Sequence, residues 1–130
     1  MRAPAWSLLP LLVLGACSRE EPVSIECPAL IIPAIAVEVS DATDGRWIAD
    51  SARGAVRDGE YVDSLVPYRF KDDKLSTLQA AGDRPGVYDV TVQHDGYVDW
   101  AVVGVEAKAT TCSVETVTLS ARMQRRRAGG

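Results

Sequence analysis

The chain has 130 residues, with 14 Lys and Arg against 18 Asp and Glu and a formal net charge of −4. This length supports one domain with a modest hydrophobic core. The acidic balance argues against nucleic-acid binding, which requires a basic face, and no nucleic-acid partner is expected.

The first element in chain order is an apolar leader. The positively charged Arg2 precedes an apolar stretch that runs from about Ala5 to Ala16. The stretch is shorter than the roughly 20 residues that cross a bilayer core, and Pro4 and Pro10 disfavour a continuous helix. Residues 1–16 are therefore predicted to be a secretory signal peptide.

The leader ends in Leu14-Gly15-Ala16-Cys17, which resembles the lipobox of bacterial lipoproteins. In that family the cysteine thiol receives a diacylglycerol, the preceding peptide is removed, and the new amino terminus is acylated. The resemblance implies a bacterial envelope protein that contacts membrane lipid through an acylated Cys17, and several acyl chains give stable anchoring. Ser18, in place of Asp, implies delivery to the outer membrane. The alternative is an ordinary signal peptide with an incidental cysteine.

Residues 17–32 are predicted to be the lipidated cysteine and a tether. The polar stretch 18–26 contains one proline and reaches at most about 30 Å when extended. If Cys17 is lipidated, Cys27 and Cys112 form the only intrachain pair, and a disulfide between them is expected in an oxidising compartment. A zinc site built from these two cysteines and His94 is the weaker alternative, because CxxC spacing is missing.

Residues 33–123 carry the alternating patterns of β-strands. Ile35, Val37 and Val39 alternate with smaller or polar residues, and turn residues follow from Asp41 to Gly45. The block 54–66 predicts a hairpin that turns at Asp58-Gly59. Residues 67–83 break the pattern and predict a long loop with at most one helical turn.

Regular alternation returns after this loop. Strands are expected over 86–93 and 98–109, joined by a turn at Asp95-Gly96, and Gly104 is expected to mark a bulge or bend. A last strand is predicted over 113–123. Residues 124–130 are expected to form a disordered basic tail, with contacts from Arg122 and Arg125–Arg127 to anionic lipid as the alternative.

About seven short strands with frequent turns predict an all-β, seven-stranded antiparallel sandwich. Two stretches, residues 37–65 and 85–123, resemble the carboxypeptidase regulatory-like domain. That resemblance implies a prealbumin-like (transthyretin-like) topology over about residues 33–123, with structural rather than catalytic residues carried over. The matching positions are Asp41, Gly45, Arg46, Gly86, Tyr88, Val90, Gly96, Tyr97, Val117 and Leu119.

The sequence lacks the motifs of common hydrolases and is predicted not to be an enzyme. The chain has one histidine and neither a HExxH nor a GxSxG motif. The turn carboxylates lack the DxDxDG spacing of a calcium loop, so solvated turn residues are the preferred interpretation, with calcium binding left open. Four aromatic residues could either form an exposed platform that binds sugar or peptide, or fill the hydrophobic core: Trp47, Trp100, Tyr61 and Tyr68. The core role is favoured.

These observations predict a non-enzymatic, lipid-anchored binding or structural module without a cofactor. An envelope protein or polysaccharide is the expected partner. The candidate contact loop comprises Arg69, Phe70, Lys71, Asp72, Asp73 and Lys74. The alternatives are an inhibitor or accessory subunit of an envelope enzyme and a small-ligand carrier of the transthyretin type.

Overall fold

The computed structural model describes Gly15 and residues 26–69 and 76–127. Within these residues no helix is long and apolar enough to cross a membrane. The one helical element there is a short 3₁₀ turn, η1 (Ala49–Ser51). The strands are β1 (Pro33–Asp41), β2 (Arg53–Asp58), β3 (Tyr61–Arg69), β4 (Ser76–Gly82), β5 (Gly86–Gln93), β6 (Trp100–Ala107) and β7 (Val117–Met123).

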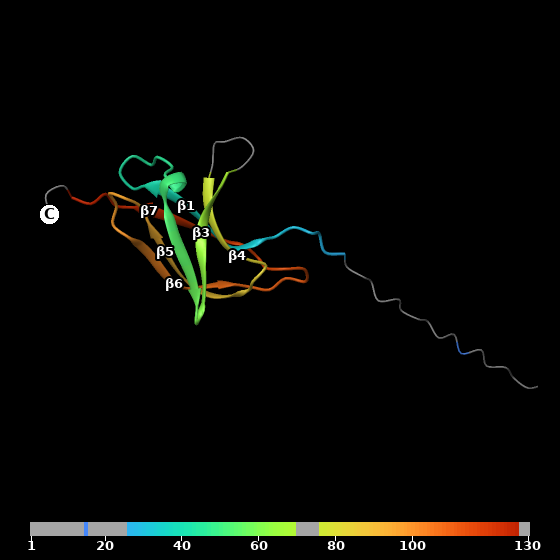
Figure 1. Cartoon of the computed structure of the whole chain (residues 1–130). Helices are drawn as coiled ribbons and strands as arrows, with labels where there is room; N and C mark the ends of the chain where they lie inside the picture. The colour runs from blue at the N-terminus through green and yellow to red at the C-terminus, as the bar shows by residue number, and fades with distance from the viewer. Residues whose placement is uncertain (1–14, 16–25, 70–75, 128–130) are drawn as a thin grey trace, which may run out of the picture.

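The seven strands form one mixed sheet in the order β6-β5-β2-β3-β4-β1-β7. Strands β1 and β7 pair in parallel, from Ile35 opposite Val117 to Asp41 opposite Met123, and every other pairing is antiparallel. The sheet curls into a nearly closed, barrel-like body (Figure 1). The all-β class and the seven strands predicted from the sequence are confirmed, but the sheet is not antiparallel throughout.

The core lies inside this curled sheet. The inward residues Ile35, Val37 and Val39 of β1 are fully buried, as their alternation predicts. Strand β5 contributes Tyr88 and two valines to the same core. Of the outward residues between them, Ala36 is only 6% exposed and Glu38 is half-buried.

Residues that follow β7 are part of the fold. Tyr97 forms an isolated bridge with Arg125, the Val98 amide donates to the Gln124 carbonyl at 2.8 Å, and the Arg126 amide donates to the Gly96 carbonyl at 2.8 Å. This corrects the expectation of a disordered tail for residues 124–127. The stretch pairs with the β5–β6 connection and covers the end of the barrel where β1 finishes.

The expected loop over 67–83 is largely strand. Residues 67–69 extend β3 and residues 76–82 form β4, with Val66 opposite Gln79 and Tyr68 opposite Thr77. Only 70–75 lies outside the described residues, and it includes Phe70–Lys74 of the candidate contact loop. Arg69, the first residue of that loop, ends β3 and donates from Nη2 to Asp50 Oδ2 at 2.9 Å.

The β5–β6 pair contains the irregularity expected at Gly104. Its register shifts between Tyr88 and Val90, so that Val103 and Gly104 oppose the single residue Asp89. Gly104 has a φ of +71°, which a residue without Cβ adopts readily. Its amide donates to Asp89 Oδ1 at 3.2 Å. The bulge is thus a defined element that lets the curled sheet change direction.

A disulfide ties the segment before β1 to the β6–β7 connection. The sulfurs of Cys27 and Cys112 are 2.09 Å apart, with their Cα atoms 5.3 Å apart. Beside this bond, Asp83 Oδ1 accepts hydrogen bonds from the Ile32 amide at 3.0 Å and the Ser113 hydroxyl at 2.6 Å. These two bonds, the Ile32 amide first, lower the pKa of Asp83. The chain is therefore fastened to the domain from Cys27 onward.

Candidate functional site

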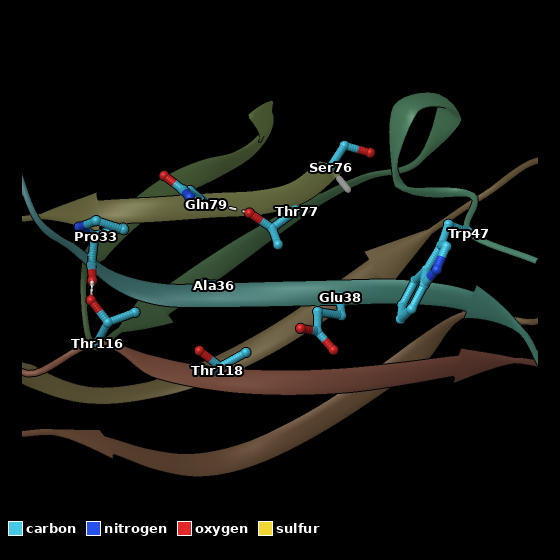
Figure 2. Close-up of a pocket in the computed structure, with 9 residues that line it drawn as sticks. All are labelled: Pro33, Ala36, Glu38, Trp47, Ser76, Thr77, Gln79, Thr116 and Thr118. Carbon is cyan, nitrogen blue, oxygen red and sulfur yellow. Dashed lines mark hydrogen bonds between the residues drawn. The ribbon is translucent and has the colours of Figure 1, made fainter. Parts of the chain in front are cut away.

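A surface hollow of about 380 Å³ lies over the outward face of β1 and its two neighbours, β4 and β7. This volume falls within the range of about 300–1,000 Å³ for small-molecule sites. Figure 2 shows the lining side chains standing on the three strands, with Trp47 at one end. We call this site the Trp47 hollow; its lining residues are Pro33, Ala36, Glu38, Trp47, Ser76, Thr77, Gln79, Thr116 and Thr118.

The aromatic wall of the hollow is Trp47. Its ring stands at the end of β1, and in Figure 2 Glu38 lies between it and Thr118. Trp47 is 48% exposed, so the core role favoured from the sequence is wrong for this residue. The same holds for Tyr68, which is 51% exposed, whereas Trp100 and Tyr61 pack against the core as expected.

The remaining walls are mostly polar. Gln79 Nε2 donates to Thr77 Oγ1 at 3.1 Å, and Thr116 Oγ1 donates to the Pro33 carbonyl at 2.6 Å. Glu38 is half-buried and is the only charged side chain among the described residues of the lining. Within the described part of the chain, its carboxylate has no hydrogen bond or ion pair. The hollow therefore presents an indole face, several hydroxyl and amide groups, and one uncompensated negative charge.

A tight turn after β1 positions Trp47. The Gly45 amide donates to the Asp41 carbonyl at 2.8 Å, and the Asp41 amide donates to the Arg46 carbonyl at 2.9 Å. Gly45 has a φ of +75°, which favours glycine at this point of the turn. Trp47 then forms a bridge with Ser40, so the chain folds back along the strand it has just left. The indole is consequently presented from a hydrogen-bonded backbone rather than from an open loop.

The turn is itself fixed by a buried carboxylate. Asp41 is fully buried, and its Oδ1 accepts the amides of Thr43 at 2.7 Å and Asp44 at 3.2 Å. Its Oδ2 accepts from the Tyr97 hydroxyl at 2.5 Å and from Arg125 Nε at 2.6 Å. Arg125 also reaches Asp44 Oδ2 at 3.0 Å. We call these four side chains, Asp41, Asp44, Tyr97 and Arg125, the Asp41 cluster.

The electrostatics of the Asp41 cluster suit a structural anchor. The Tyr97 hydrogen bond, followed by Arg125 and the two turn amides, lowers the pKa of Asp41 far below its usual range, against the opposing effect of burial. In return, the bond to Asp41 is the largest cause that raises the pKa of Arg125. The expectation of a solvated turn carboxylate is wrong for Asp41. Within the described ranges no group of three or more His, Cys, Asp or Glu residues is arranged to hold a metal ion.

The other expected turn residues lie away from the hollow. Asp58 and Gly59 sit at the β2–β3 hairpin, where Asp58 Oδ2 accepts from Arg84 Nη1 at 3.0 Å. Asp95 and Gly96 form the β5–β6 turn, where Asp95 pairs with Arg53 at 3.2 Å. His94 belongs to that turn, since its Nδ1 lies 2.8 Å from the Asp95 carbonyl. Cys17 lies outside the described residues.

Most of the hollow was not identified from the sequence. Most of its residues are ordinary outward residues of strands, namely Glu38, Thr77, Gln79 and Thr118, and Thr116 directly precedes β7. Three strands must be placed side by side before these residues form one surface. Glu38 at an outward position of a strongly alternating strand is the one local signal. Comparison of the sequence with protein-family models and with curated proteins finds no match. The fold and the site therefore define the class of the protein only as an all-β domain, with one disulfide and an aromatic, polar surface hollow.

Proposed function

We propose that the chain is a bacterial envelope lipoprotein whose β domain is a non-enzymatic binding module, and that the Trp47 hollow is its binding face. The Leu14–Cys17 sequence supports lipid anchoring at Cys17, and Ser18 supports the outer membrane as its location. One observation above the others supports binding: a Trp47 ring that is 48% exposed is held on a hydrogen-bonded turn beside the Glu38 carboxylate, which has no partner among the described residues.

The proposed domain type is a prealbumin-like sandwich similar to the carboxypeptidase regulatory-like domain. Its support is the turn from Asp41 through Gly45 to Trp47, which coincides with the first family-like motif, and the Tyr97 position of the second motif. Tyr97 and Asp41 come from those two motifs and are hydrogen-bonded to each other. The residues that carry the resemblance thus have a structural reason to occur together.

A binding role fits the hollow better than hydrolysis of a sugar chain. Glycoside hydrolases generally use two carboxyl groups that flank the scissile bond. Among the described residues that line the hollow, Glu38 is the only acidic one, and Thr77, Gln79 and Thr118 have no acid strength at neutral pH. An indole beside hydroxyl and amide groups orients a ligand without supplying general acid–base chemistry.

The anchor is tested by the intact mass of the protein isolated from bacterial membranes. The proposal predicts a chain that begins at Cys17 and carries diacylglycerol and an amide-linked acyl chain. A Cys17→Ser variant should lack the lipid and leave the membrane fraction. A native protein with an unmodified Cys17 thiol would contradict the anchor, whatever the hollow binds.

The binding face is tested by photo-crosslinking in intact envelopes. A benzophenone amino acid is placed at Thr118, an exposed residue of the hollow, and at Val103, which is 74% exposed on β6 and outside the hollow. We expect a crosslinked adduct from position 118 that is absent at position 103. Equal crosslinking from both positions, or none from 118, would show that this face has no partner in the envelope.

A further inference from the structure

We infer that the Trp47 hollow binds a neutral glycan chain, that is, a chain of pyranose rings without carboxylate or phosphate groups. This inference rests on the proposed binding function and assigns the chemical class of its ligand. It comes from the combination of an exposed indole, a carboxylate and neutral hydrogen-bonding groups on one continuous surface.

The first step concerns Trp47. A pyranose ring has one face made of C–H groups and a rim of hydroxyl groups. The C–H face packs on a flat aromatic ring, which has a large apolar area and few rotatable bonds. In Figure 2 the indole stands upright at the end of the hollow and turns toward the strand surface that carries Glu38. A ring seated there contacts the indole on one side and the sheet below.

The second step concerns the polar groups. A carboxylate accepts hydrogen bonds through both oxygens, and bonds to a charged acceptor are shorter and stronger than neutral ones. Glu38 has this capacity unused within the described residues. The exposed Thr118 hydroxyl and the Gln79 amide supply groups that both donate and accept, while the buried Thr77 hydroxyl accepts from Gln79 Nε2 and orients that amide. This set matches the rim of a sugar, whose hydroxyls also donate and accept.

The third step concerns charge. Glu38 is the only charged side chain among the described residues that line the hollow, and within the described part of the chain it forms no ion pair. An acidic chain, such as a uronic acid polymer, would bring carboxylates close to Glu38 and lose affinity through repulsion. A neutral chain avoids this repulsion while still using the carboxylate as an acceptor.

The fourth step concerns shape and rigidity. The hollow runs along β1 from Pro33 past Glu38 to Trp47, and Pro33 and Glu38 alone span about 17 Å of strand. This length accommodates consecutive pyranose rings rather than one small molecule. The Asp41 cluster already fixes the turn that presents Trp47. Ligand binding therefore costs little conformational entropy in this turn.

The test uses the full lipoprotein in a detergent that has no sugar head group, titrated by calorimetry with three tetrasaccharides. The probes are cellotetraose, N-acetylchitotetraose and tetragalacturonate. We expect saturable binding of at least one of the two neutral probes, with at least about tenfold weaker binding of the acidic one. Failure of both neutral probes to bind, or equal binding of the acidic probe, would overturn the inference.

Variants locate the binding. Trp47→Ala should weaken binding by about tenfold or more, whereas Trp47→Phe, which retains an aromatic ring, should keep most of it. Glu38→Gln should weaken binding by about three- to tenfold. Val103→Ala and Glu106→Gln change exposed β6 residues outside the hollow and serve as matched controls. Neutral-probe binding that survives Trp47→Ala unchanged would overturn the site even if the glycan class is correct.

The same variants separate this inference from the proposed function. If position 118 crosslinks in envelopes but both neutral probes fail, and mass spectrometry of the adduct identifies a peptide rather than a sugar chain joined to position 118, the binding module stands and the glycan assignment is wrong. If position 118 gives no adduct in envelopes while a neutral probe binds through Trp47, the glycan site stands and the envelope role is wrong.

Discussion

The Tyr97 hydroxyl donates a hydrogen bond to the buried Asp41 Oδ2 at 2.5 Å, across 56 positions of sequence. Arg125 Nε donates to the same oxygen from the other end of the chain. The turn after β1, the β5–β6 turn and the residues after β7 therefore meet at one carboxylate. Since the first of these turns presents Trp47, this junction supports both the stability of the barrel end and the geometry of the hollow.

Removal of the Tyr97 hydroxyl should destabilise the protein. In Tyr97→Phe the aromatic ring remains, but the buried Asp41 loses a hydrogen-bond donor. A hydrogen bond to a charged group contributes about 1.5–3 kcal/mol, so we expect a decrease of that size in the free energy of unfolding measured in urea. A decrease below about 0.5 kcal/mol would contradict the importance of this bond.

Of the three arginines at the end of the described chain, Arg125 and Arg127 should behave differently. Arg125 bonds both Asp41 and Asp44, whereas Arg127 is exposed and makes no hydrogen bond or ion pair within the described residues. Arg125→Ala should lower the thermal midpoint clearly, and Arg127→Ala should leave it close to that of the wild type. Equal effects would show that residues after β7 are not held by the Asp41 cluster.

Asp41 should make stability depend on acid pH. In the unfolded chain its pKa is near 3.9, and in the fold its hydrogen bonds hold the pKa well below that value. As the pH falls from about 5 through 4 and below, the unfolded chain takes up a proton that the folded protein does not, so the free energy of unfolding decreases; this stabilisation is fully present at higher pH.

The contribution of Asp41 to the pH dependence of stability is isolated by comparing the variants Asp41→Asn and Asp95→Asn. Asp95 serves as the control because its side chain is 92% exposed. Between pH 5 and pH 3, denaturant unfolding should show a smaller change of stability with pH in Asp41→Asn than in the wild type. A pH dependence that is lost equally in both variants would exclude Asp41 as its source.

The disulfide should stabilise the domain by restricting the unfolded chain. Cys27 and Cys112 are 85 positions apart, and the chain-entropy treatment gives about 4–5 kcal/mol for a loop of this length. The double variant Cys27→Ser/Cys112→Ser should lose stability approaching this amount, measured by denaturant unfolding. A reducing agent should destabilise the wild type and leave the double variant unchanged; sensitivity of both would contradict the assignment.

Gly54 should be the least replaceable glycine of the sheet. A Cβ built at Gly54 would lie 2.1 Å from the Thr91 carbonyl oxygen of β5, whereas a Cβ at Gly59 meets open space. Gly54→Ala should therefore separate β2 from β5 and cost at least about 2 kcal/mol. Gly59→Ala, with a φ of +59°, should cost about 1–2 kcal/mol through backbone strain. The reverse order would contradict the close approach of the two strands.

Local pattern predicted the strands whose two faces differ most. The alternation in β1 is visible because Ile35, Val37 and Val39 are buried while Glu38 is not. The same reasoning missed β4, where Thr77 and Gln79 stand outward beside a charged run, so that the sequence looked like a loop. Antiparallel pairing with β3 makes this segment a strand, and that pairing is not a property of the segment alone.

Long-range contacts explain the remaining differences between the predictions from sequence and the structure. The parallel pairing of β1 with β7 joins residues about 80 positions apart, such as Ile35 and Val117, and no local signal distinguishes it from antiparallel pairing. Arg125 looked like part of a solubilising tail because its partner, Asp41, lies at the other end of the chain. The Trp47 hollow was missed for the same reason, since three strands contribute to it.

The central claim, that the Trp47 hollow is a glycan-binding face, is tested most directly by the indole N–H resonances of the ¹⁵N-tryptophan-labelled full-length protein during titration with the neutral tetrasaccharides. Trp47→Phe assigns the resonance of Trp47 by its disappearance. We predict that the Trp47 resonance shifts progressively with each addition while that of the partly buried Trp100 stays in place. A Trp47 resonance that does not move at saturating probe would contradict the account.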